Sequence, residues 1–510
     1  MCCGRSPAGK RARPSSPRRC RFSAMAAMQV TVERRAPRAA TALAVAVPAR
    51  GALPREVPLT RAQLSALGFE GTPGQVATLP ARGSSVVIAV GVGDPRAMDA
   101  AALRTAAALA ARAASSHAHL ATDLAAQGKG DRAALAQAVV EGLRLATHRY
   151  DALKGDKGAT PALAHVSLVV PAAAQSAVRA GVARGTTIAD AVCLARDLAN
   201  MPPAYLTARM LADRAVAIAG AAGLRAEVFN KDQLLAMGCG GMIGVNQGSV
   251  EPPRMVRLTY AGTGRGKHPH LVLVGKGVTY DSGGISLKPS DPSHAMMKAD
   301  MSGAAAVLAT MASLRALGCK ADVTGYLMCT DNLPSGSALK MGDVITIRNG
   351  KTVEIHNTDA EGRLILADGL SLAAEQKPDA IVDIATLTGA CARALGPHMA
   401  GVMGNHQGVV DQLLACAGRT QEKLWQLPLE REYRKLIDSY IADMKNVGGA
   451  DAGAITAALF LDEFTDGRPW AHLDIAGPMW ADADAGWLQL GATGYGTRLL
   501  IDLAEHFAKP

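Results

Sequence analysis

Three short segments of this 510-residue chain place charged side chains among small and apolar residues. They are Gly275–Lys288, Met297–Gly303 and Asn357–Leu364. Together they contain four carboxylates that could gather at one partly buried place: Asp281, Asp300, Asp359 and Glu361. Because ions buried without partners are strongly destabilising, such a cluster requires positive charge.

Two divalent cations would supply four positive charges, which the four carboxylates would balance. Oxygen ligands favour Mn²⁺ or Mg²⁺, and Zn²⁺ also accepts carboxylates. Histidine is absent from all three segments, so a zinc centre built on imidazole is not expected. These residues therefore predict metal-assisted chemistry at a carboxylate-rich centre.

Each segment also has a simpler explanation when it is taken alone. An Asp before a helix is most often an N-cap, and Lys288 alone would be a solvated surface lysine. The Asp-x-Glu-x-Arg pattern could form a ladder of ion pairs. Gly275-Lys-Gly277 could suggest a phosphate loop, but it lacks the required G-x-x-x-x-G-K-[ST] spacing. The joint occurrence of the segments favours a metal site.

Alternating strand and helix patterns around these segments predict an α/β fold with helices on both faces of a sheet. Lys276 and Asp281 are expected in a loop after the strand 271–275, where open α/β sheets bind ligands. Asp300 is expected before a helix that opens at Ala304, which favours a carboxylate. Asp359, Glu361 and Arg363 are expected to precede a helix over 364–375. Further strands are predicted at 323–329, 380–384 and 471–475.

The chain divides into four predicted parts. The composition of residues 1–27 predicts a basic, disordered tail or a leader, and the pattern of residues 28–180 predicts a small N-terminal α/β domain. In that domain we expect strands at 85–91 and 166–171, and helices at 99–113 and 131–147. A linker helix over 181–200 should end before Pro202 and Pro203, because proline does not continue a helix. Residues 201–510 form the predicted catalytic domain.

The net charge of +10 belongs to the N-terminal end of the chain. Residues 1–50 contain eleven basic residues and one acidic residue, which leaves 43 of each kind in the remainder. This balance does not favour a nucleic-acid-binding surface. No segment has the roughly 20 apolar residues of a membrane helix. The nine cysteines, apart from Cys2 and Cys3, are scattered, which is typical of reduced thiols in an intracellular protein.

The basic segment 1–27 has two interpretations. The first is a segment without function in the folded protein, namely a disordered tail or leader sequence upstream of a start at Met25 or Met28. The second is a transit peptide for organelle import, since such peptides are rich in Arg and Ser and poor in acidic residues.

The three segments resemble the signature of the leucyl aminopeptidase family, which consists of cytosolic metallo-exopeptidases with two metal ions. The most specific match is Asn357-Thr-Asp-Ala-Glu-Gly-Arg363. Asp281-Ser-Gly-Gly-Ile-Ser-Leu-Lys288, Ala385-Thr-Leu-Thr-Gly-Ala390 and His472-Leu-Asp-Ile-Ala-Gly477 match as well. The similarity extends from about 185 to 500 and implies a small N-terminal domain and a larger catalytic domain with a mixed central sheet.

The resemblance implies a role for each charged residue. Asp281 and Glu361 would bridge both metals, Asp359 would complete the looser site, and Lys276 and Asp300 the tighter one. The metals would be Zn²⁺, with Mn²⁺, Co²⁺ or Mg²⁺ at the exchangeable site. A lysine ligand must be neutral, and two nearby cations favour that form.

Lys288 and Arg363 would be catalytic in this family pattern. Lys288 would stabilise the oxyanion, and Arg363 would hold a bicarbonate ion that acts as general base. The metals would activate water and bind the free α-amine of the peptide substrate, which explains exopeptidase action. The pocket for the first side chain would favour Leu and other apolar residues, and it would be lined by Met297, Thr386, Leu387, Gly389, Ala476 and Met479.

The family further implies a cytoplasmic homohexamer, a dimer of trimers.

The sequence favours two other functions less. Some bacterial members act as DNA-binding regulators, which the neutral charge of residues 51–510 does not favour. A catalytically silent homologue has no reason to keep the full set of ligands, so the intact constellation favours an enzyme.

Overall fold

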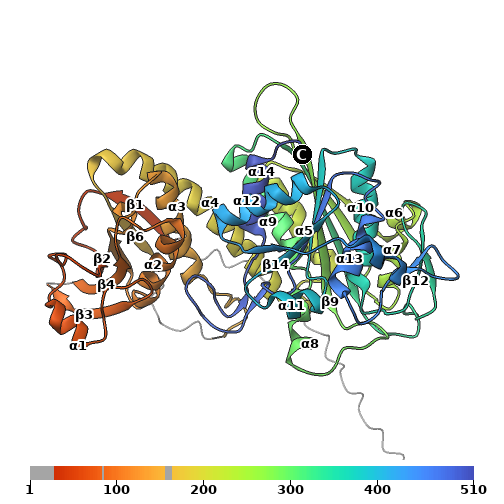
Figure 1. Cartoon of the computed structure of the whole chain (residues 1–510), viewed down its shortest axis with the longest axis horizontal. Coiled ribbons are helices and arrows are strands. Elements are labelled where there is room, and N and C mark those ends of the chain that lie inside the picture. The colour runs from red at the N-terminus through yellow and green to blue at the C-terminus, as the bar shows by residue number, and fades with distance from the viewer. Residues whose placement is uncertain (1–27, 83–84, 156–162) are drawn as a thin grey trace, which may run out of the picture.

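The computed structural model describes residues 28–82, 85–155 and 163–510, and the predicted basic tail 1–27 lies outside them. The chain forms two α/β units joined by a long helix (Figure 1). The predicted fold class is confirmed, because a smaller α/β unit precedes a larger one with a mixed sheet flanked by helices. No helix in the described ranges is both long and apolar enough to cross a bilayer.

The first unit is a six-stranded sheet with the order β1-β6-β5-β2-β4-β3, parallel except for β3. Its strands are β1 (Gln29–Glu33), β2 (Ala42–Pro48), β3 (Val76–Arg82), β4 (Ser85–Gly93), β5 (His119–Thr122) and β6 (His165–Val169). The helices are α1 (Arg61–Ala66), α2 (Ala100–Ala113) and α3 (Arg132–Thr147). Asp99 and Asp131 cap α2 and α3 by accepting backbone hydrogen bonds, as expected for residues at these positions.

Helix α4 (Gln175–Asn200) links the two units and begins six residues earlier than the sequence pattern predicts. A 3₁₀ turn over Ala172–Ala174 leads directly into it, so the helix is already nucleated before residue 181. Gly181 and Gly185 let α4 pack closely on α3, since a Cβ at Gly181 would lie 2.2 Å from the Ala133 carbonyl oxygen. The helix ends just before the two prolines, as predicted.

The second unit is built on an eight-stranded mixed sheet with the order β15-β14-β17-β13-β9-β10-β8-β7. The four central strands run parallel, whereas β14 and β8 are antiparallel to their inner neighbours. The strands are β7 (Arg225–Phe229), β8 (Arg254–Tyr260), β9 (His270–Asp281), β10 (Asp322–Asn332), β13 (Ala380–Ala385), β14 (Ala400–Gly404), β15 (Leu424–Gln426) and β17 (Trp470–Asp474).

Helices cover both faces of this sheet. One face packs against α4, α5 (Ala208–Ala222), α9 (Ser302–Leu317), α12 (Gln407–Thr420) and α14 (Thr497–His506). The other face packs against α6 (Lys231–Ala236), α7 (Gly240–Asn246), α10 (Glu361–Glu375) and α13 (Gly453–Asp462). The shorter elements are α8 (Pro292–Met296), α11 (Gly389–Leu395), β11 (Val344–Thr346), β12 (Thr352–Glu354), β16 (Met444–Lys445), β18 (Trp480–Ala481) and β19 (Gly491–Ala492).

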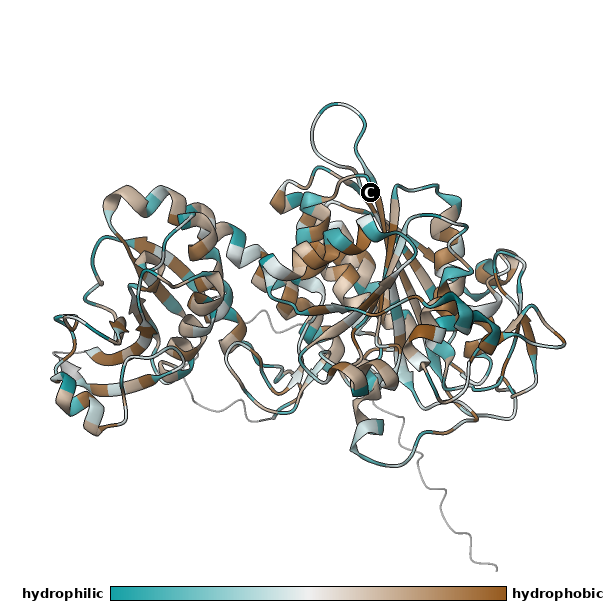
Figure 2. Ribbon diagram, viewed as in Figure 1, coloured by the Kyte–Doolittle hydropathy of each residue, from teal (hydrophilic) through white to brown (hydrophobic). Residues whose placement is uncertain are grey.

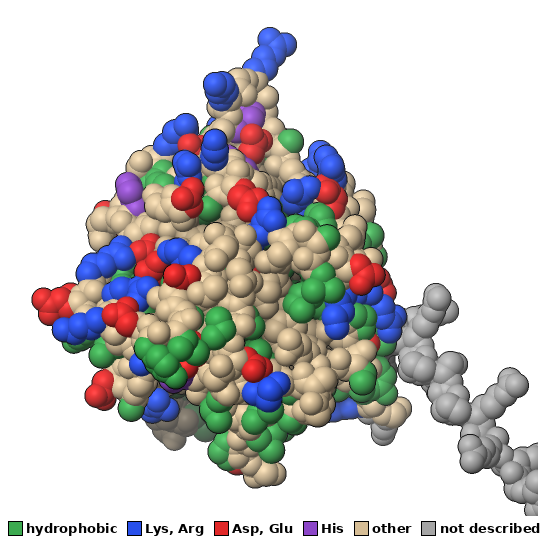
Figure 3. All heavy atoms as spheres, turned by 90° about the vertical axis from the view of Figure 1, so that its right-hand side faces the viewer, with side chains coloured by type: hydrophobic (Ala, Val, Ile, Leu, Met, Phe, Trp, Pro, Cys, Tyr) green, Lys and Arg blue, Asp and Glu red, His purple; other side chains and the backbone are tan. Residues whose placement is uncertain are grey.

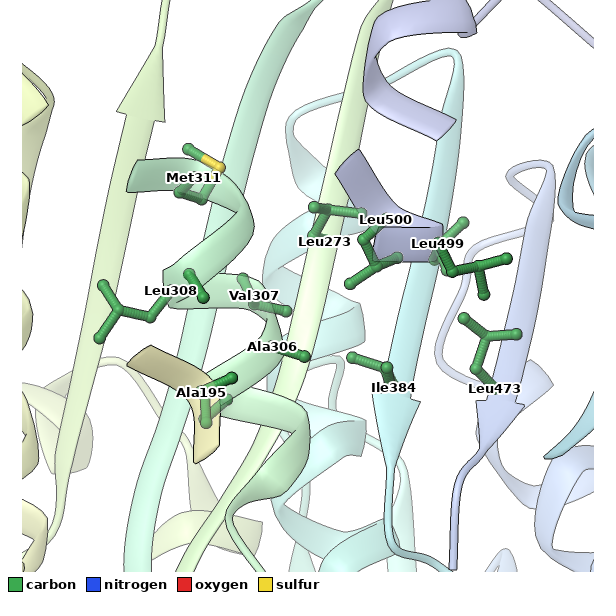
Figure 4. Packing of buried hydrophobic residues seen from close by; sticks show 14 of the residues in the cluster. Ala195, Leu273, Ala306, Val307, Leu308, Met311, Ile384, Leu473, Leu499 and Leu500 are labelled. Carbon is green, nitrogen blue, oxygen red and sulfur yellow. The ribbon is translucent and has the colours of Figure 1, made fainter. Parts of the chain in front are cut away.

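Side chains of β9 alternate between the two apolar cores. Leu271 and Leu273 face the α9 side, whereas Val272 and Val274 face the α10 side. Figure 4 shows Leu273 among side chains of α9 and α14, and Figure 2 shows that the strands in the interior of both units are apolar.

On the face of the molecule in Figure 3, acidic and basic side chains are interspersed, in agreement with the neutral charge of residues 51–510.

The glycines that follow Val274 do not make the turn that the sequence pattern predicts. Instead, β9 continues to Asp281, so Lys276 lies within the strand and not in a loop after it. Gly275 and Gly277 permit close packing: a Cβ at Gly275 would lie 2.6 Å from Ala304 Cα, and one at Gly277 would lie 2.7 Å from the Met328 carbonyl oxygen. The prediction of a loop was wrong because glycine serves here for backbone contact.

Helix α10 also begins earlier than predicted. Glu361 and Arg363 belong to its first turn, and only Asp359 precedes it. The acidic side chain of Glu361 is favourable at this end of a helix, which explains why the helix can start there.

Asp368, in the middle of α10, predicts a pH dependence of stability. Burial raises the pKa of this carboxyl to about 7 from its ordinary value of 3.8, although hydrogen bonds from the backbone amides of Met242 and Arg348 oppose the shift. The native state holds this proton more tightly than the unfolded chain does. Protonated Asp368 therefore makes its full contribution to the free energy of unfolding below pH 3.8, and this contribution is lost as pH rises through 7. The shift corresponds to roughly 4 kcal/mol.

Urea unfolding between pH 4 and pH 8 tests this expectation on the Asp368→Asn variant. Relative to this variant, the parent chain should lose free energy of unfolding as pH rises. The matched control is Asp411→Asn, on the exposed side of α12. A constant difference between the parent chain and Asp368→Asn across this range would contradict the prediction.

Candidate metal centre

The predicted acidic residues meet at the carboxyl end of the central strands. Asp281 ends β9, Asp300 precedes α9, and Glu361 opens α10. One carboxylate oxygen of each of these residues lies within 4.8 Å of the others. The convergence follows from the packing of α9 and α10 on opposite faces of β9, which brings their first turns to the same edge of the sheet.

Two lysines neutralise part of this cluster. Lys276 Nζ lies 2.8 Å from Asp300 Oδ1 and 2.8 Å from Glu361 Oε1, and it donates a hydrogen bond of 3.0 Å to the Thr386 carbonyl oxygen. A side chain at Gly362 would collide with Lys276, because its Cβ would lie 2.7 Å from Nζ. The glycine of the Asn357–Arg363 segment therefore makes room for the lysine.

Lys288 connects the remaining two carboxylates. Its Nζ lies 2.8 Å from Asp281 Oδ2 and 2.5 Å from Asp359 Oδ1. Lys276 is nearly inaccessible, whereas the side chain of Lys288 is 18% exposed. Lys288 is thus the lysine that a molecule entering from solvent can reach.

The pKa values indicate that the cluster lacks positive charge. Burial, with repulsion from Glu361, raises the pKa of Asp281 to about 7, and burial holds the pKa of Asp300 well above its usual range. Burial lowers the pKa of Lys276, but the surrounding carboxylates outweigh this effect and raise it above the ordinary value. Two lysines thus leave Asp281 and Asp300 without enough positive charge, although Lys276 outweighs the effect of burial on Glu361 and keeps the pKa of that carboxyl below its ordinary value.

Carboxylate oxygens without hydrogen-bond donors mark the place where cations fit. Asp300 Oδ2 is buried and accepts no hydrogen bond within the described part of the chain. Asp359 Oδ1 and Glu361 Oε1 lie within ion-pair distance of the lysines but outside hydrogen-bonding geometry. Such oxygen donors, held close together, are suitable ligands for divalent cations.

Asn332, which sequence reasoning missed, joins two of the ligand segments. Its side-chain amide donates hydrogen bonds of 2.8 Å to Asp281 Oδ1 and 3.0 Å to the Thr358 carbonyl oxygen. A break in the strand register between Thr330 and Asn332 turns this side chain toward the centre. An isolated Asn at a strand end carries no sequence signal, so only the fold reveals its role.

Replacement of Asn332 by alanine should lower metal affinity and activity by roughly 10- to 100-fold, as is typical when a group that orients a ligand is removed. Asp281 would keep its charge and the hydrogen bond from the Gly283 amide but lose the side-chain donor that helps to fix its orientation. Metal titration followed by activity assays would measure the effect. Asn349→Ala, at an exposed turn, is the matched control, and equal metal affinity in the two variants would disprove this role.

Arg363 is buried beside the cluster and is held by a second asparagine that the sequence did not single out. Its Nη1 donates a 2.7 Å hydrogen bond to the Asn446 carbonyl oxygen, whereas its Nε has no acceptor among the described residues. The Asn446 side chain donates to the Asn357 carbonyl oxygen at 2.6 Å. Burial lowers the pKa of Arg363 to about 10, which keeps it cationic at neutral pH. Arg363 can therefore still accept an anionic partner.

Three of the six residues predicted to line a substrate pocket, Thr386, Leu387 and Ala476, lie just after the ends of β13 and β17. Thr386 Oγ1 donates to Asp300 Oδ1 at 2.6 Å. The amides of Leu387 and Ala476 both donate to Asp474 Oδ1, at 3.3 and 3.1 Å. Asp474, which sequence reasoning also missed, thus ties these two segments together. The other three predicted pocket residues are Met297 beside Asp300, Gly389 at the start of α11, and buried Met479 before β18.

Known proteins share both units. Residues 193–501 match the model of the cytosol aminopeptidase family, catalytic domain, and residues 58–157 match that of its N-terminal domain. A probable cytosol aminopeptidase of Synechococcus sp. (strain JA-2-3B'a(2-13)) is 42% identical over 443 residues, covering 85% of this chain and 87% of the relative. One of Chlorobaculum tepidum is 45% identical over 394 residues, with coverages of 75% and 77%.

Solved structures agree with these matches. The bottromycin maturation enzyme BotP in complex with Mn is 40% identical, with a TM-score of 0.84 over 91% of this chain and 99% of that enzyme. A mutant of the tomato leucine aminopeptidase is 28% identical, with a TM-score of 0.82 over 94% and 96% of the two chains. Sequence and structure together show that this chain belongs to the cytosol aminopeptidase family, whose members are metal-dependent peptidases.

Proposed function

We propose that this chain is a leucyl aminopeptidase that uses two divalent cations to release N-terminal residues from peptides, preferably Leu and other apolar residues. The observation that carries the proposal is the carboxylate cluster of Asp281, Asp300 and Glu361, whose ligand oxygens lie within 4.8 Å of one another. Family membership supports aminopeptidase activity, and the cluster supports the metal requirement.

In this proposal, Asp281 and Glu361 would be shared by the two cations, Asp359 would complete the exchangeable site, and Lys276 and Asp300 would complete the tighter one. The ions would be Zn²⁺, or Mn²⁺, Co²⁺ or Mg²⁺ at the exchangeable site; one similar structure is a complex with Mn. When bound, such cations polarise the scissile carbonyl and make water acidic enough to attack it near neutral pH.

Lys288 is the proposed oxyanion donor. Its ammonium group already lies at the carboxylates of Asp281 and Asp359, and it is the more accessible of the two lysines. When those carboxylates serve as ligands, the ammonium is available to donate a hydrogen bond to the substrate oxygen that gains negative charge. The lysine thus stabilises the transition state without being a ligand.

Arg363 is the proposed anchor of the general base, a bicarbonate ion. Its buried guanidinium uses Nη1 to bind the Asn446 carbonyl oxygen and leaves Nε without an acceptor. A planar guanidinium pairs well with a planar anion of this kind. Arg363 would hold such an anion beside the cluster, where the anion would supply a general base.

The substrate pocket in this proposal combines apolar and small residues: Met297, Thr386, Leu387, Gly389, Ala476 and Met479. Such a lining favours aliphatic first side chains.

We also propose that the protein is a cytoplasmic homohexamer, a dimer of trimers. Each subunit would consist of an N-terminal domain (28–180), a linker helix (181–200) and a catalytic domain (201–510).

Chelation provides the direct test. Hydrolysis of Leu-p-nitroanilide should cease after treatment with a chelator and return when Zn²⁺, Mn²⁺, Co²⁺ or Mg²⁺ is added back to the refolded, metal-free protein. N-acetyl-Leu-p-nitroanilide is the matched control substrate, because it lacks the free amine. Activity that is independent of metal, or equal hydrolysis of the blocked substrate, would overturn the proposal.

A further inference from the structure

We propose that Arg393 extends the substrate range to peptides with an N-terminal glutamate, whose carboxylate it binds at the outer end of the pocket for the first side chain. This inference rests on the proposed aminopeptidase function and adds a substrate class to it. Three observations support it: the position of Gly389, the position of the Arg393 guanidinium, and the absence of an internal partner for that charge.

The segment that ends at Gly389 starts at the metal centre. Thr386 accepts a hydrogen bond from Lys276 through its carbonyl oxygen, and Thr388 Oγ1 donates to Asp474 Oδ2 at 2.7 Å. Gly389 then opens α11 and is exposed. This short, firmly bound segment therefore leads from a proposed ligand to the surface of the pocket.

The guanidinium of Arg393 lies over the missing side chain of Gly389. A Cβ at Gly389 would lie 3.5 Å from Arg393 Nη1, and among the described residues no other heavy atom outside its two chain neighbours and the nearby backbone of α11 would come within 4 Å. Arg393 is four residues farther along α11, so the two positions lie on the same face of the helix. The space above Gly389 is thus open and is bounded by a positive charge.

This charge has no acidic partner among the residues that the structure describes. No carboxylate of these ranges lies within 4.0 Å of Arg393, whereas Arg104, for example, pairs with Glu141 at 2.8 Å. The other proposed pocket residues are uncharged. An exposed guanidinium with all its donors available is suited to a bidentate contact with a carboxylate.

Glutamate is the acidic residue that fits this geometry best. The backbone of Arg393 lies one helical turn after Gly389, and its side chain reaches back so that Nη1 lies 3.5 Å from a Cβ at Gly389. Because Gly389 is the exposed end of the segment that starts at buried Thr386, a carboxylate must extend away from the metal centre to reach this guanidinium, and glutamate extends one methylene farther than aspartate. Glutamine has the same shape without the charge, so it isolates the electrostatic contribution.

The experiment compares kcat/KM for Glu-p-nitroanilide and Gln-p-nitroanilide with the metal-loaded full chain. Arg393→Ala should lower the Glu/Gln ratio by roughly threefold or more, and Arg393→Glu should lower it further, since the pair is partly solvent-screened. Arg393→Lys should retain much of the ratio. Added 0.5 M salt should lower the ratio in the parent chain but not in Arg393→Ala.

Arg265→Ala is the matched control, because Arg265 is exposed on the loop before β9, at the opposite end of the strand from the metal centre. A Glu/Gln ratio that is unchanged in Arg393→Ala and Arg393→Glu would overturn the inference. If the metal-loaded parent chain hydrolysed neither Leu- nor Gln-p-nitroanilide, the proposed function itself would fail. The two failures are therefore distinguishable.

Discussion

Replacement of Lys288 by alanine is expected to lower kcat for Leu-p-nitroanilide by roughly 10²- to 10³-fold, the usual effect of removing one oxyanion donor. The lysine touches two of the carboxylates but is not among the proposed ligands, so the metal content should change little. Steady-state kinetics, combined with metal analysis of the same preparation, would separate these two effects.

The control for Lys288 is Lys340→Ala, since Lys340 is exposed and pairs with Asp343 at the surface. If Lys288→Ala retained the activity of the parent chain, the assignment of the oxyanion donor would be wrong. If it instead lost its metal, Lys288 would have a role in holding the ligands in place.

Glu361→Gln is expected to weaken metal binding by at least about 100-fold, the upper value for loss of a group that merely orients a ligand. The amide preserves the shape of the side chain but removes its charge and one oxygen. Lys276 would remain paired with Asp300, which lies 2.8 Å from its Nζ, so the fold should persist. Activity should fall in parallel with metal occupancy.

Metal content per subunit and activity at limiting metal concentration would measure this effect. Glu375→Gln is the matched control because Glu375 ends the same helix, is half-exposed and pairs with Arg348. Full metal occupancy in Glu361→Gln would show that Glu361 is not a ligand.

The charged residues of the centre were predictable from the sequence because several of them lie close together in it. Asp359, Glu361 and Arg363 lie within five residues of one another, and their charges would be costly in a partly buried helix start without a function. The helix caps Asp99 and Asp131 were predictable for the same reason, since capping depends on neighbours in the sequence.

The supporting residues were not predictable because they act across long sequence separations. Asn332 lies 51 residues from the Asp281 carboxylate that it orients, and Asn446 lies 83 residues from Arg363. Asp474 likewise reaches back to Leu387, 87 residues earlier. No pattern within a short window encodes such contacts, so they emerge only when the strands are placed side by side.

Glycine was the main source of error within single elements. Gly275 and Gly277 suggested a turn, yet in β9 they permit contact with α9 and β10. The same residue type does form left-handed caps elsewhere, as at Gly318 after α9, where φ is 68°. Sequence alone does not distinguish these two uses, because both depend on the absence of a side chain.

The placement of Lys276 within β9 also determines how the folded chain can open. Strand β9 is hydrogen-bonded to β13 on one side and β10 on the other, in the middle of the eight-stranded sheet. Amides in such a strand exchange their hydrogens with solvent only through the largest unfolding events, whereas exposed loop residues such as 449–451 open in smaller ones. The chain can therefore rearrange the rim of its active site repeatedly while the lysine at its base stays fixed.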